Sequence, residues 1–109
     1  MTRPVNHRER IEGWLRDALA MRGDQVGFIV TPGSALVEGA QVPGWMLFVT
    51  MRHPLLGQGD LYVPAAVPSL TLTQSFINRV VLEALKELDD KYAEIQRQAM
   101  QQAPVSGVR

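Results

Sequence analysis

The feature that most constrains the fold of this chain is the run Trp45–Met51, its longest largely apolar stretch without glycine or proline. Pro43-Gly44 precedes the run and His53-Pro54 follows it, so the run is too short and too well bounded for a helix and predicts a strand. Successive side chains of a strand point to opposite faces, and here both sets are apolar. We therefore predict a central strand that is covered on both faces.

Two amphipathic helices and two further strands are predicted around this central strand. They are a helix over residues 7–22, a strand over 25–31, a short strand over 60–63 and a helix over 72–102. Apolar residues recur at three- and four-residue steps in the helices and favour alternate positions in the strands. The order α-β-β-β-α predicts an α+β fold, a three-stranded antiparallel meander sheet flanked by an N-terminal helix and a long C-terminal helix. One domain over 1–103 and a flexible C-terminal tail over 104–109 are expected.

Several boundary residues carry specific expectations. Gly23 is predicted to end the first helix in a left-handed conformation. Pro64 is predicted to end the third strand at a sheet edge, because proline lacks a backbone N–H. Either Thr71 or Thr73 can cap the last helix. The segment over 34–43 has two alternatives, a long hairpin loop or a strand extension with a bulge.

The predicted sheet and the predicted last helix present more apolar surface than the chain can cover by itself. A helix of about 31 residues is roughly 45 Å long, whereas a compact domain of this size is about 30 to 35 Å across. Either one helix lies on each sheet face, or both share one face and a second subunit covers the other. We therefore predict a protein–protein interaction or assembly module that is homo-oligomeric. Its interface candidates are Trp45, Leu47, Val49, Leu88, Tyr92, Ile95 and Ala99, with Met46 and Phe48 as the alternative face of the central strand.

Residues that carry chemistry are sparse. The chain has no cysteine and two histidines, His7 and His53, so a convergent metal site is not expected, and neither is a cofactor. His53 and Asp60, with the loop over 31–43, form the one arrangement that would support proton transfer. A turn histidine with a local hydrogen bond explains His53 more simply, so a non-enzymatic protein is predicted and an enzyme or small-molecule binder is the competing hypothesis.

Nucleic-acid binding is an alternative that depends on a local patch, because the formal net charge is zero and gives no overall attraction to phosphates. Its candidates are Arg3, Arg8, Arg10, Arg16 and Arg52. The element order is similar in outline to that of the double-stranded-RNA-binding domain, a resemblance of topology that implies a basic cluster at the start of the last helix. Here residues 74–79 hold one cation and the loop over 31–40 holds none.

The location of the protein is predicted from the lack of a signal peptide and of a membrane-spanning stretch in the sequence. No apolar stretch reaches the length of a signal peptide or a membrane span, so a small soluble, cytoplasmic protein without a membrane partner is expected. Small assembly proteins of tailed phages are similar in outline, being short, cysteine-free and α/β. A structural or assembly protein of a phage particle is therefore a further alternative.

Overall fold

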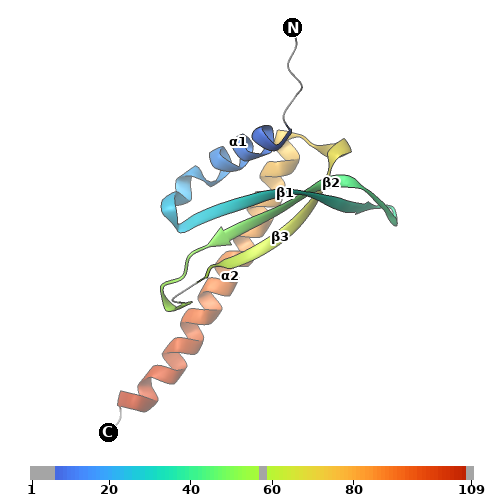
Figure 1. Ribbon diagram of the computed structural model, residues 1–109. Coiled ribbons are helices and arrows are strands. Elements are labelled where there is room, and N and C mark those ends of the chain that lie inside the picture. The colour runs from blue at the N-terminus through green and yellow to red at the C-terminus, as the bar shows by residue number, and fades with distance from the viewer. Residues whose placement is uncertain (1–6, 57–58, 108–109) are drawn as a thin grey trace.

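The computed structural model describes residues 7–56 and 59–107, with side chains described as far as residue 101. Figure 1 shows an N-terminal helix, a three-stranded antiparallel sheet and a long C-terminal helix, so the predicted α+β fold and its order are confirmed. The main elements are α1 (His7–Leu19), β1 (Val26–Val37), β2 (Ala40–Met51), β3 (Leu61–Pro68) and α2 (Gln74–Gly107). Short 3-10 segments, η1 (Ala20–Gln25), η2 (Pro54–Leu56) and η3 (Ser69–Thr71), lie between them.

β2 is the central strand of the order β1-β2-β3, as predicted. β1 and β2 are longer than expected because their antiparallel register continues without a break to the pair Val37 and Ala40. Between these residues, Glu38 and Gly39 have φ angles of 52° and 83°, the positive values that a two-residue hairpin turn requires. The segment over 34–43 is therefore a strand extension, and its register contains no bulge.

β3 differs from its prediction at Pro64. The strand does not end there but continues to Pro68, and Val67 pairs with Trp45 of β2. β3 is an edge strand, where proline is accepted because no further strand needs its missing N–H. The predicted edge position is confirmed, and the predicted strand end is wrong.

The helix boundaries also differ in part. α1 ends at Leu19, and Gly23 lies within the following η1 segment with a positive φ of 61°. At the start of α2, the N–H of Phe76 donates a hydrogen bond of 3.2 Å to Oγ1 of Thr73, so Thr73 is the cap among the two alternatives. The helical backbone of α2 continues to Gly107, five residues beyond the predicted end.

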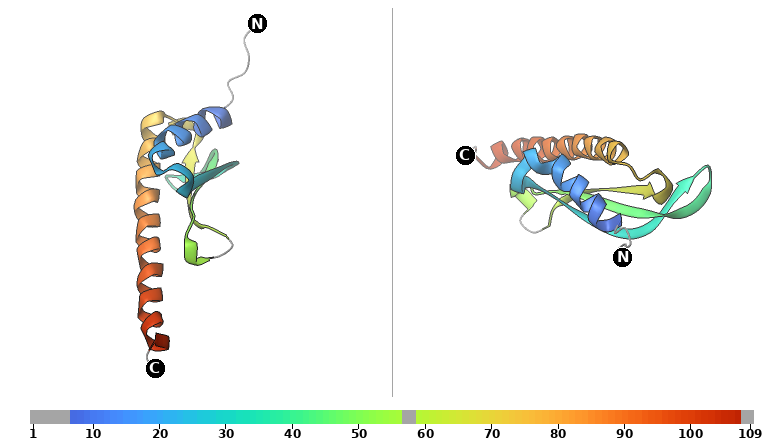
Figure 2. Two further views of the ribbon diagram at one scale, coloured as in Figure 1. Left: turned by 90° about the vertical axis from the view of Figure 1, so that its left-hand side faces the viewer. Right: turned by 90° about the horizontal axis from the view of Figure 1, so that it is seen from above.

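Both helices cover the same face of the sheet. Their apolar side chains join those of β1, β2 and β3 in one core cluster, and α2 runs along one side of the sheet in Figure 2. The largest fully buried side chains are Ile11, Leu15, Leu47, Val49, Met51, Val67, Ile77, Val81 and Leu88. Within the described residues, the central strand is thus covered on one face and not on both. The arrangement with both helices on one face is the one that the chain adopts.

A bidentate ion pair joins η1 to α2. Nη1 and Nη2 of Arg22 donate hydrogen bonds to the two carboxylate oxygens of Asp89 at 3.1 and 2.9 Å, and these bonds hold the pKa of the Asp89 carboxyl below its ordinary value. The side chains remain 34% and 49% exposed, so solvent screening limits the pair to about 0.5 to 1 kcal/mol.

We expect a double-mutant cycle of Arg22→Ala and Asp89→Ala to give a coupling energy of about 0.5 to 1 kcal/mol at pH 7, measured by urea denaturation. A carboxylate whose pKa is lowered in the folded state stabilises the fold above its unfolded pKa, so the coupling should decline as the pH falls below about 4. The pair Glu87 and Lys91, at 3.8 Å within one helix, is the control and should couple more weakly. A coupling energy that does not change with pH would contradict the prediction.

Candidate functional site

The sheet face opposite the two helices forms the candidate site, which we call the open face. Directly paired residues of an antiparallel sheet point to the same face, so alternate positions of the three strands share this side. They are Gly27, Ile29, Thr31, Gly33, Ala35 and Val37 of β1, Ala40, Val42, Gly44, Met46, Phe48 and Thr50 of β2, and Tyr62, Pro64, Ala66 and Pro68 of β3. None of these residues is charged. An antiparallel sheet face in contact with water is normally polar, so this composition is unusual.

The middle of the open face is apolar and exposed. Ile29 and Tyr62 are each 57% exposed, and Phe48 lies beside Ile29 in the register of β1 and β2. The rings of Phe48 and Tyr62 meet edge to face, with 6.1 Å between their centroids. A shallow hollow of about 390 Å³ is lined by these three side chains together with Thr50 and Asp60. Exposed apolar side chains that gather in one place are typical of a binding surface.

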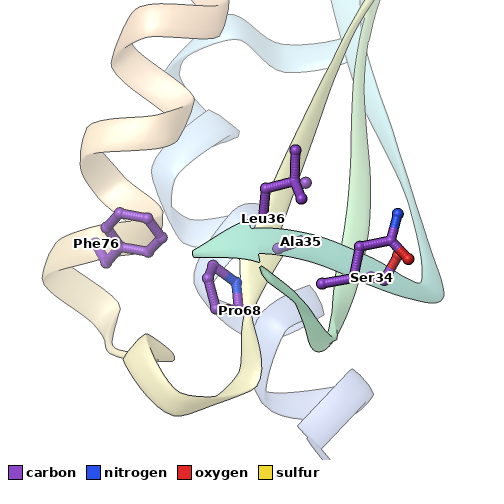
Figure 3. Close-up of a pocket in the computed structure, with 7 residues that line it drawn as sticks. Ser34, Ala35, Leu36, Pro68 and Phe76 are labelled. Atoms are coloured by element: carbon purple, nitrogen blue, oxygen red, sulfur yellow. The ribbon is translucent and has the colours of Figure 1, made fainter. Parts of the chain in front are cut away.

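A second hollow, of about 610 Å³, lies at the end of the sheet near the β1–β2 hairpin. Figure 3 shows its walls, with Phe76 on α2, Pro68 at the end of β3 and Leu36 near the end of β1. The complete lining is Ser34, Ala35, Leu36, Gln41, Ala66, Pro68 and Phe76, with no titratable side chain. Such a lining suits contact with an uncharged group and not proton transfer. Two of its lining residues, Ala66 and Pro68, also belong to the open face.

The interface candidates on the central strand lie on its other side. Leu47 and Val49 have no exposed area, and neither has Leu88 on α2, because these side chains pack together in the core. Trp45 is partly buried against the same core. The prediction for Leu47, Val49 and Leu88 is therefore corrected: they hold the helices on the sheet and are not accessible to a partner. The alternative face, with Met46 and Phe48, is the one left open.

The remaining interface candidates, Tyr92, Ile95 and Ala99, form what we call the α2 stripe. Tyr92 is partly buried, and its ring lies 4.1 Å from the ring of His53, measured between centroids. The C-terminal part of α2 projects past the sheet in Figure 1. Ile95 and Ala99 follow Tyr92 along α2, and both are of intermediate exposure. These two residues stay predicted interface residues.

The structure does not join His53 and Asp60 as a proton-transfer pair. His53 is 2% exposed, whereas Asp60 lies on the surface. Nδ1 of His53 accepts a hydrogen bond of 3.0 Å from the N–H of Leu55, and Nε2 has no hydrogen-bond partner among the described residues. The imidazole therefore caps the η2 turn. Within the described ranges, no three His, Asp or Glu side chains gather as a metal site.

The arginine candidates that the structure describes do not form one continuous basic face. Arg8, Arg10, Arg16 and Arg52 are exposed, and Arg3 lies outside the described residues. Each residue of a helix turns by about 100°, so Glu12 lies between Arg8 and Arg16 around α1. Arg10 points to a different side, and its guanidinium lies 5.7 Å from the centre of the Trp14 ring. A nucleic-acid phosphate would meet mixed charge along this helix.

No helix in the described part of the chain is both long and apolar enough to cross a membrane. Comparison of the chain with known proteins found no family model that matches it, and no similar curated protein or solved structure.

Proposed function

We propose that this chain is a non-enzymatic protein–protein interaction or assembly module that forms a homo-oligomer through its open face. The observation that supports this proposal is the placement of both helices on one side of the sheet, which leaves an uncharged side where Ile29 and Tyr62 are each 57% exposed. Burial of apolar surface is favourable by about 25 cal/mol per Å². Binding of a partner that covers this face is therefore favoured.

The shape of the open face favours a macromolecular partner over a small ligand. Small-molecule sites are concave and enclose most of their ligand, whereas the open face is spread over three strands and its central hollow is shallow. Protein interfaces combine aromatic residues with few charges at their centre, as Phe48 and Tyr62 do here. Assembly of a phage particle is one setting in which such a module would work.

We expect Phe48→Lys to weaken self-association at least tenfold, measured as the mean mass by light scattering on a sizing column over a range of concentrations. The substitution places an ammonium group at the centre of the open face, where a partner would have to desolvate it. Because Phe48 lies outside the core cluster, the circular dichroism spectrum should stay unchanged.

Leu82→Lys is the matched control, since Leu82 is 67% exposed on α2 and the change adds the same charge in place of an apolar side chain. The mean mass of this variant should equal that of the wild type at each concentration. A wild-type chain that remains a monomer at every concentration would contradict the proposed self-association. An equal effect of both substitutions would show that the open face is not the binding surface.

A further inference from the structure

We infer that the open face of one copy packs on the open face of a second copy about a two-fold axis. The resulting dimer has four layers, with the two sheets inside and the helices of each copy outside. This inference rests on the proposed function and specifies its partner and geometry. Facing sheets pack about 10 Å apart with their strands within about 30° of each other, so Ile29, Phe48 and Tyr62 of the two copies would interdigitate.

The lack of charged residues on the open face is compatible with its packing on the same face of a second copy. In a two-fold interface the two subunits use the same surface patch. A charged residue near the axis would therefore face the same charged residue of the second copy. The open face carries no charged residue, and the net charge of zero means that two copies do not repel each other at long range. Asp60 lines the central hollow beside Tyr62, and its exposed position at the rim lets its carboxylate stay hydrated.

The edges of the sheet are poorly suited to the other common mode of association, in which strands of two sheets pair side by side. That mode needs a row of free N–H and C=O groups along an edge. The outer strands are β1 and β3, and they contain Pro32, Pro64 and Pro68, which have no N–H to donate. Continuous pairing with another copy is thus interrupted at both edges, and the open face is the remaining sheet surface.

The area of the open face places the proposed dimer in a size class of interface. Taken flat at about 3.3 Å per residue and 4.8 Å per strand, strands of 12, 12 and 8 residues cover roughly 500 Å². Two copies would bury about 1,000 Å² in total, near the lower limit for a specific interface. Interfaces of this size are typical of weak and transient complexes, so we expect a dimer that dissociates reversibly, with a Kd on the order of micromolar or weaker.

Single cysteines can test this geometry, because the chain has none of its own. We expect Met46→Cys, near the centre of the open face, to be joined to a second copy by a short bismaleimide at concentrations above the Kd. Leu82→Cys, on the exposed side of α2, is the control and should give at least tenfold less covalent dimer. Crosslinking of Ile95→Cys measures in the same way whether the α2 stripe lies between two copies. The mass of the uncrosslinked wild type should level off at twice the chain mass of 12.1 kDa.

Covalent dimer specific to Met46→Cys, with a mass that stops at two copies, would support the inference. If Phe48→Lys disrupts association but Met46→Cys gives no more product than Leu82→Cys, the inference is overturned while the proposed function stands. Growth of the mass beyond two copies would also overturn it, because head-to-tail contacts do not close as a dimer. A strictly monomeric wild type would overturn both the inference and the proposed self-association.

Discussion

We expect Leu47→Ala to lower the free energy of unfolding by about 2 to 5 kcal/mol. Leu47 lies on the central strand with no exposed area, among the side chains that α1 and α2 bring to the core. Removal of its isobutyl group loses the transfer free energy and leaves a cavity that packed neighbours on two helices cannot readily fill. Urea denaturation, followed by circular dichroism, measures the change.

Phe48→Ala is the matched control, since it removes a larger side chain from the next position of the same strand. Phe48 faces away from the helices and lies outside the core cluster, so its loss should cost the monomer about 1 kcal/mol or less. Both variants have to be compared below the concentration at which the chain associates, because dimer formation adds to the apparent stability. Equal costs for the two substitutions would contradict the assignment of the covered and open faces.

The type and order of the elements could be predicted because each depends on local patterns. The alternation within residues 25–31, the helical spacing in both terminal segments and the punctuation around Trp45–Met51 each identify an element. The extent of β1 and β2 could not be predicted in the same way. Their hairpin turns at Glu38-Gly39, and a glutamate with a positive φ is uncommon, so the usual turn signals did not point there.

The choice of the covered face was not predictable from the central strand alone, because both of its sides are apolar. The register with β1 decides it, since Val30 pairs with Leu47 and Ile29 with Phe48. That register follows from the position of the hairpin turn. The sequence does not identify Ile29 as an interface residue, because it is a single apolar side chain between Gly27 and Thr31. Once the turn is known, the pairing of Ile29 with Phe48 shows that the open face is continuous across the strands.

We expect Gly44→Ala to lower the free energy of unfolding by at least about 2 kcal/mol, near the upper part of the range for overpacked sites. A Cβ atom at this position would lie 2.4 Å from the carbonyl oxygen of Val67 and 3.1 Å from its carbonyl carbon. Both are backbone atoms, so no side chain can rotate away, and relief requires β3 to move from β2. Thermal or urea denaturation measures the loss.

Gly33→Ala is the control, because Gly33 pairs directly with Gly44 in the register and differs in its surroundings. Its added Cβ would lie 3.5 Å from Cβ of Met46, an ordinary contact, so we expect a change within about 0.5 kcal/mol. A Gly44→Ala variant as stable as Gly33→Ala would mean that β3 does not approach β2 at Val67. The strand would then end near Pro64, as its sequence suggests, and the open face would lose the part formed by Ala66 and Pro68.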